Sequence, residues 1–167
     1  AVDFKNPKVR NFALAATSKH FKNVQKSGDV RIMIQCFAVF KEIRNNWNYV
    51  NDPKGSEYIA DASESLQHFS GDCDDHAILM AACIKAIGGT PRIIHTGGHL
   101  YPEMLIGDKN NLETAIFLIK AGQFKEAFHF LESGLLLDYD KHEIIFEYFP
   151  NMETQKAIYK LIQQYKK

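Results

Sequence analysis

Residues 70–106 read SGDCDDHAILMAACIKAIGGTPRIIHTGGHLYPEMLI and carry the strongest structural signals in the chain. Asp72 and the two aspartates that follow shortly after it are typical of a helix N-terminus, and the next residues are good helix formers with apolar spacing. The pair Gly88–Gly89 ends such a helix. The sequence therefore predicts a buried helix that begins near Asp72 and holds Cys73 in its first turn.

Two strand-like runs follow the glycine pair, over 91–95 and 99–106, and the turn residues Thr96, Gly97 and Gly98 separate them. Runs of this kind around a short glycine turn predict an antiparallel hairpin. His99 opens the second strand. The helix that carries Cys73 is thus expected to pack on a sheet that carries His99.

The remaining elements are predicted from apolar periodicity and turn residues. Three helices precede the quoted stretch: one from Asn6–Pro7, a long one from Asp29 to Trp47, and a short one capped by Ser63 that ends at His68. The segments that follow it are a helix over 111–121, strands over 128–131, 135–139 and 143–149, and a helix over 152–165. Residues 112–138 can instead be interpreted as one helix–turn–helix unit of a repeat protein. A solenoid needs about three such repeats to bury a continuous core, and the chain offers one.

Helices followed by strands indicate an α+β fold. We expect one domain over 1–167, with an N-terminal helical part at 1–69, a catalytic core at 70–149 and a C-terminal helix at 150–167. A chain of 167 residues is large enough to bury its own core without disulfide bonds.

Composition excludes several classes of protein. Lys plus Arg and Asp plus Glu both total 20, so there is no net charge to attract nucleic acid. The longest run without polar side chains, Ala77–Ile84, is far shorter than the roughly 18 residues that cross a bilayer. Because the chain starts at Ala1 rather than Met, we expect an exported or membrane-anchored parent protein, while the compartment itself stays open.

Cys73 is the cysteine with a suggestive position. The partial positive charge of a helix N-terminus favours a thiolate, and a histidine such as His99 can take the proton. Most free cysteines are small buried hydrophobic residues, and the three aspartates around Cys73 oppose a negative charge on its sulfur. Nucleophile and core residue are therefore both open from position alone.

No group of His, Cys and carboxylate residues shows a compact ligand spacing, so no metal and no cofactor is expected. His95 and His99 are four residues apart, about 13 Å on one extended strand, which is too far to share a metal unless Gly97 and Gly98 fold the chain back. His76 and His95 are interpreted as structural or solvated rather than as ligands.

Three blocks of sequence together resemble the transglutaminase-like superfamily. The first is Gly71, Asp72 and Cys73 with the helix that follows and its Pro91–Arg92 exit; the second is His99, Tyr101 and Glu103; the third is 135–139, LLLDY. The resemblance covers roughly residues 60–140 and extends to small bacterial domains of this type that are regarded as cysteine proteases. Three blocks in order are much more specific than any one of them.

The resemblance implies a papain-like core in which Cys73, His99 and Asp138 form a Cys-His-Asp triad. It implies an oxyanion donor as well, for which Trp47 and Gln67 are the candidates. The third block lacks the usual aromatic residue and carries Asp140 in place of a threonine, and the gap after His99 is long. Asp108 therefore stays a second, weaker candidate for the acid.

The expected function is acyl transfer by a cysteine on peptide or carboxamide bonds of a protein or peptide substrate. Hydrolysis is favoured over crosslinking because the short chain shows no separate site for an amine donor. The alternative is a binding module that keeps the fold and does not use the triad. The sequence does not specify the substrate or the oligomeric state.

Overall fold

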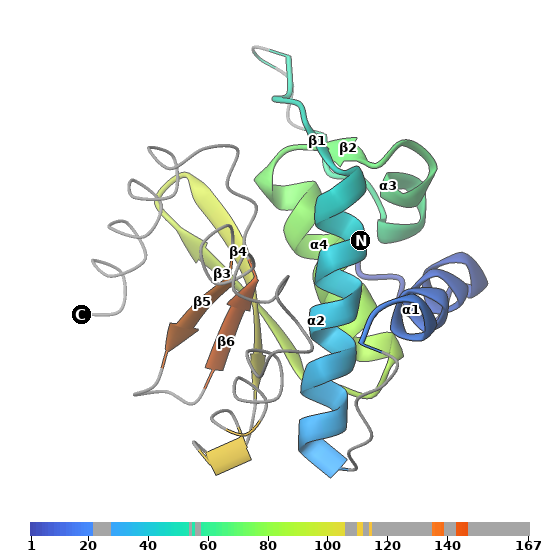
Figure 1. Ribbon diagram of the computed structural model, residues 1–167. Helices are drawn as coiled ribbons and strands as arrows, with labels where there is room; N and C mark the ends of the chain where they lie inside the picture. Colours follow the sequence, from blue (N-terminus) through green and yellow to red (C-terminus); the bar gives the residue numbers. More distant parts are fainter. Residues whose placement is uncertain are drawn as a thin grey trace.

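The computed structural model describes residues 1–21, 28–53, 55, 58–105, 110, 111, 114, 135–138 and 143–146, and gives the backbone alone for the last two ranges. The fold is α+β, with four helices, a two-stranded sheet and a four-stranded sheet among the described residues (Figure 1). This confirms the predicted fold class.

The helices are α1 (Pro7–Lys19), α2 (Gly28–Asn46), α3 (Ala62–His68) and α4 (Cys73–Ala86). All four were predicted, and the Asn6 side chain caps α1 by accepting a hydrogen bond from the Lys8 N–H at 3.0 Å. The predicted cap of α3 is wrong, because Asp61 occupies the N-cap position. Ser63 lies inside the helix instead, and its hydroxyl donates a hydrogen bond to Asp3.

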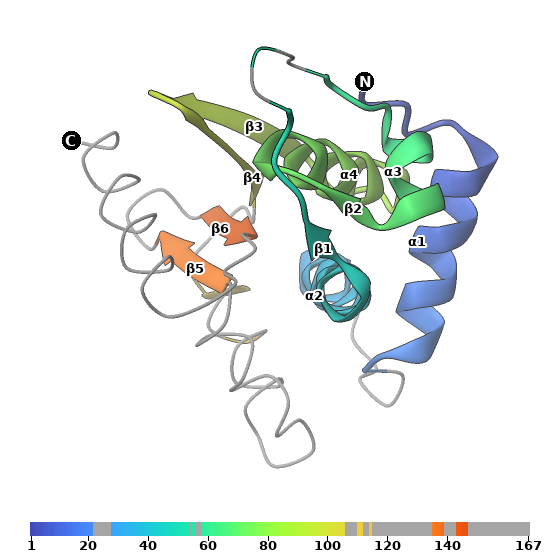
Figure 2. The same cartoon turned by 90° about the horizontal axis from the view of Figure 1, so that it is seen from above.

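Helix α4 lies at the centre of the structure. It packs against α1, α2 and α3 on one side and against the sheet strands β3 (Pro91–Thr96) and β4 (His99–Leu105) on the other (Figure 2). Its residues from 75 to 84 are all buried. Side chains such as Phe40 of α2 and Leu79 of α4 are fully buried, and each contributes about 2 kcal/mol through loss of apolar surface to water.

Strands β3 and β4 form the predicted antiparallel hairpin, with Thr96 opposite His99. Strands β5 (Leu135–Asp138) and β6 (Glu143–Phe146) complete the sheet in the order β3-β4-β6-β5. The strand that carries Asp138 therefore does not pair with the strand that carries His99, because β6 lies between them. Strand β6 pairs antiparallel with both β4 and β5.

The second sheet was not predicted. Its strands β1 (Asn48–Tyr49) and β2 (Ser70–Gly71) run parallel, with Tyr49 opposite Gly71. The N–H groups of Asn48 and Val50 donate to the carbonyls of Phe69 and Gly71 at 2.8 and 2.9 Å. This pairing holds the end of α2 against the start of α4.

Several predicted elements, and the candidate residue Asp108, lie wholly or partly outside the described residues. The predicted helix over 111–121 is described only at residues 111 and 114, which are helical. The strand over 128–131, the C-terminal helix and Asp108 lie outside the described residues. Within the part of the chain that the structure describes, no helix is both long and apolar enough to span a bilayer.

Candidate active site

The first turn of α4 is held by a reciprocal pair of aspartates. The Asp72 side chain accepts hydrogen bonds from the N–H groups of Asp74 and Asp75, and the Asp75 side chain accepts one from the Asp72 N–H. Such a capping arrangement satisfies N–H groups that a helix start otherwise leaves open, and contributes about 1 kcal/mol. It fixes Cys73 as the first residue of the helix.

Gly71 allows the chain to pass close to this cap. A Cβ atom at position 71 would lie 2.5 Å from the Cβ and 2.8 Å from the Cγ of Asp75, closer than atoms can approach. Asp75 in turn reaches the next segment, because its Oδ1 accepts a hydrogen bond from the Ala60 N–H at 3.1 Å. Glycine at position 71 therefore leaves room for the Asp75 side chain, which accepts hydrogen bonds from the backbone N–H groups of both Asp72 and Ala60.

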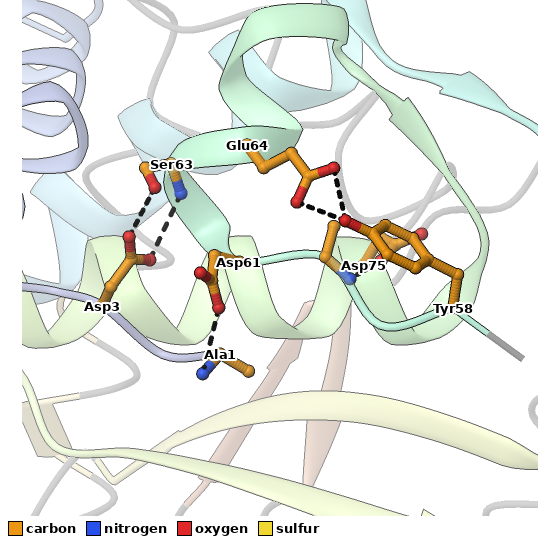
Figure 3. A network of polar contacts seen from close by, with 8 residues as sticks. Ala1, Asp3, Tyr58, Asp61, Ser63, Glu64 and Asp75 are labelled. Atoms are coloured by element: carbon orange, nitrogen blue, oxygen red, sulfur yellow. Dashed lines mark hydrogen bonds and ion pairs between the residues drawn. The ribbon is translucent and has the colours of Figure 1, made fainter.

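The segment 58–64 lies over the same end of α4 (Figure 3). The Tyr58 hydroxyl donates to both carboxylate oxygens of Glu64, and the Tyr58 N–H donates to Asp52 at 3.1 Å. Tyr58 and Ile59 are each 56% exposed. An anchored loop thus presents apolar surface beside the helix start that carries Cys73.

The Cys73 thiol is partly exposed and has two polar neighbours. Its Sγ donates to Asp74 Oδ1 at 3.4 Å. The Tyr49 hydroxyl is the second neighbour, because it lies close enough for its pKa to respond to the backbone N–H and the thiol of Cys73. Burial, followed by the charges of Cys73 and Asp72, raises the pKa of Tyr49, so this phenol keeps its proton.

Carboxylates gather at this end of the helix. Oxygen atoms of Asp52, Asp72 and Asp75 all lie within 4.8 Å of one another, as do ligand atoms of Asp72, Cys73 and Asp74. The expectation that no compact ligand spacing exists is therefore wrong. Backbone N–H groups of residues 58, 60, 72, 74 and 75 donate to the first set of carboxylates, which explains the cluster without a metal.

Burial is the largest cause that raises the pKa of Asp72 and Asp75, and the neighbouring carboxylates add to it. A carboxylate beside the Cys73 sulfur disfavours negative charge there, whereas the helix N-terminus favours it. The two effects oppose each other at the same atom.

His76 lies one turn further along α4 and is 1% exposed. Trp47 and Phe40 meet its ring edge-on, with ring centroids at 5.5 and 6.3 Å. Burial, aided by the charge of His99, lowers the pKa of His76 to about 4. The ring is therefore neutral at neutral pH, which agrees with a structural role.

His99 is buried on β4 and stacks on Tyr101, with ring centroids at 6.1 Å. It lies near enough to His76, one turn after Cys73, for the charges of the two rings to interact. Further along the same strand, buried Glu103 accepts a hydrogen bond from Arg92 of β3 at 2.7 Å. Packing of α4 on β4 thus brings His99 to the helix that carries Cys73.

Asp138 lies at a different part of the sheet. It is opposite Glu143 of β6, and Glu143 is opposite Leu105 of β4. Leu105 is six residues from His99, about 20 Å along an extended strand. The backbone register therefore does not place Asp138 beside His99.

The two proposed oxyanion donors also differ in position. Trp47 is 4% exposed, and its Nε1 makes no hydrogen bond among the described residues. Gln67 is exposed near the end of α3. Tyr49, which reaches Cys73, was missed because a two-residue strand paired with a segment 22 positions later leaves no periodic pattern in the sequence.

A model of the transglutaminase-like superfamily matches residues 23–115, which is more than half of the chain. The match includes Tyr49, Cys73 and His99 and ends before Asp138. No curated protein and no solved structure matched the chain.

Proposed function

Because the chain belongs to the transglutaminase-like superfamily, which includes cysteine-dependent acyltransferases and proteases, we propose that it hydrolyses peptide or carboxamide bonds through a thioester on Cys73. The observation that carries this proposal is the position of Cys73. It is a partly exposed thiol at the first residue of a capped helix that packs on the strand of His99.

In the first half of the reaction, His99 takes the proton of the Cys73 thiol, and the sulfur attacks the carbonyl carbon. The C–S bond forms while the carbonyl π electrons move onto oxygen. When the tetrahedral intermediate collapses, the C–N bond breaks and His99 gives its proton to the leaving amine.

In the second half, water attacks the thioester, and His99 takes a proton from that water. The C–S bond breaks, the carboxylic acid leaves and Cys73 recovers its proton. An amine in place of water would give crosslinking by the same steps. Tyr101, stacked on His99, supports the ring in the orientation that these transfers need.

A peptide substrate is favoured over a small polar one by the surface around the thiol. Val50, Tyr58 and Ile59 are more than half exposed, and two of them lie on the loop anchored to the start of α4. Apolar side chains of a peptide can bury this surface.

The second candidate is a binding module that keeps the fold without the reaction. It is favoured by the hydrogen bond from the thiol to Asp74, which disfavours the thiolate, and by the register of Asp138. The same apolar surface would then hold a protein partner without cleaving it.

One experiment separates these two functions. The chain is incubated with a defined library of synthetic peptides, with and without a fluorescent primary amine, and products are identified by mass spectrometry. Hydrolysis should occur with the parent chain and be lost in Cys73→Ala and His99→Gln. His95→Gln serves as the matched control, because His95 is exposed on the same hairpin.

Amine incorporation without hydrolysis would change the acceptor from water to an amine. Absence of any Cys73-dependent product, together with saturable binding of library peptides, would support the binding module and contradict the hydrolase.

A further inference from the structure

We propose that Tyr49 is the side-chain donor that stabilises the oxyanion formed when Cys73 attacks a carbonyl. This inference rests on the proposed nucleophilic role of Cys73. It moves the role from Trp47 and Gln67 to a residue that sequence analysis did not consider for it.

The first argument is position. The parallel pairing of β1 with β2 puts Tyr49 opposite Gly71, two residues before Cys73. The Val50 N–H, which donates to the Gly71 carbonyl at 2.9 Å, fixes this register on the C-terminal side of Tyr49. Tyr49 is 39% exposed, so its side chain borders both the thiol and the solvent from which a substrate arrives.

The second argument is that the Tyr49 hydroxyl lies close enough to Cys73 for its pKa to respond to the N–H and the thiol of that residue. A thiolate at the first residue of a helix attacks a carbonyl in such a way that the new oxyanion lies near the N–H of the same residue. The phenolic oxygen therefore lies close to the place that the substrate oxygen needs.

A substrate oxygen that accepts a hydrogen bond from this N–H would lie beside the hydroxyl. The phenol keeps its proton and can then donate it to the oxyanion, which would have two donors: the Cys73 N–H and the Tyr49 O–H. Tyr49 neither gains nor loses a proton in the step; the charge that it stabilises is the electron pair moved from the carbonyl bond to oxygen.

The other two candidates lack this geometry. Trp47 is buried edge-on against His76, which keeps its indole in the core. Gln67 is exposed on α3, and residues 69–72 separate that helix from the start of α4.

The test compares two reactions of the same thiol. Iodoacetamide alkylates the sulfur without forming an oxyanion, whereas p-nitrophenyl acetate acylates it through one. Tyr49→Phe removes only the hydroxyl. We expect the acylation rate of Cys73 to fall about a hundredfold while the alkylation rate changes by less than about threefold.

Ser18→Ala is the control for loss of a hydroxyl, because Ser18 is exposed and its hydroxyl donates to the Leu14 carbonyl within α1. Both rates should stay at the parent value in this variant. Circular dichroism establishes that each variant is folded.

Four outcomes would overturn the inference. Equal loss of both rates in Tyr49→Phe would mean that the hydroxyl only tunes the thiol, and a rise in both would mean that it only blocks access. Unchanged rates would remove Tyr49 from the reaction. A Cys73 that reacts with neither reagent in the parent chain contradicts the proposed nucleophile itself and this inference with it.

Discussion

Cys73 and Cys83 lie on the same helix and differ in almost everything else. Cys73 is the first residue of α4, is partly exposed and contacts Asp74 and Tyr49. Cys83, near the other end, is 0% exposed in the core, and burial raises its pKa strongly. The helix thus has a polar end that is suited to chemistry and a buried part that anchors it, and position alone separates a candidate nucleophile from a core residue.

The largest expected effect is on the reactivity of these two thiols. Alkylation of Cys83 requires the core to open, which costs several kcal/mol, so at pH 7 Cys73 should react with iodoacetamide at least about a thousandfold faster. Cys36, also fully buried with a raised pKa, should behave like Cys83. Peptide mapping after limited labelling measures all three rates. Similar labelling of Cys73 and Cys83 in the native state would contradict the distinction.

His76 lies on α4 between the polar first turn and the buried part of the helix. We expect it to make the free energy of unfolding depend on pH. Its pKa of about 4 in the folded chain lies below the usual 6.5, so between these values the unfolded chain binds the proton more tightly. The free energy of unfolding should therefore be highest above pH 6.5 with respect to His76. It should fall by about 3 kcal/mol as the pH drops towards 4. Urea unfolding at several pH values measures it.

His76→Gln is the reference for that measurement. The raised pKa values of Asp72 and Asp75 act in the opposite direction, because there the folded chain binds protons more tightly, but they are common to both proteins and cancel in the difference. If parent and variant lose stability in parallel from pH 7 to pH 4, His76 is not neutral and buried as described.

We expect Gly71→Ala to destabilise only the polar N-terminal end of α4. The added Cβ collides with the Asp75 side chain, and relief of the collision disturbs the cap of α4, so we expect a loss of about 2 kcal/mol in the free energy of unfolding. Gly97→Ala in the β3–β4 turn is the matched control, because a Cβ there meets nothing within 4 Å. Chemical denaturation that shows equal losses for both would contradict the close approach.

The parts of the fold that the sequence predicted are those with local signals. Asp72 before an apolar run and Gly88–Gly89 after it predicted α4 and the position of Cys73, and the Gly97–Gly98 turn predicted the hairpin. Contacts between distant segments have no such signal. The pairing of β1 with β2, and with it the contact of Tyr49 with Cys73, depends on two strands of two residues each.

The order of the strands in the sheet also depends on contacts between distant segments. Periodicity identified β5 and β6 as strands, but nothing in either run specifies which one joins the edge of β4. The triad that the resemblance implies requires Asp138 to lie near His99, and the register of β6 does not place it there.

The smallest expected effect follows from this difference. The family pattern implies that Asp138→Asn misorients His99 and lowers turnover about a hundredfold, as in other triads. With β6 between the two strands and Asp138 in register with Leu105, we expect less than a twofold change in the rate at which p-nitrophenyl acetate acylates Cys73. His99→Gln, measured beside it, should lose most of that rate, because it removes the base itself. A hundredfold loss in Asp138→Asn, with circular dichroism unchanged, would mean that Asp138 reaches His99, that the triad of the family pattern is complete, and that β5 rather than β6 lies on the edge of β4.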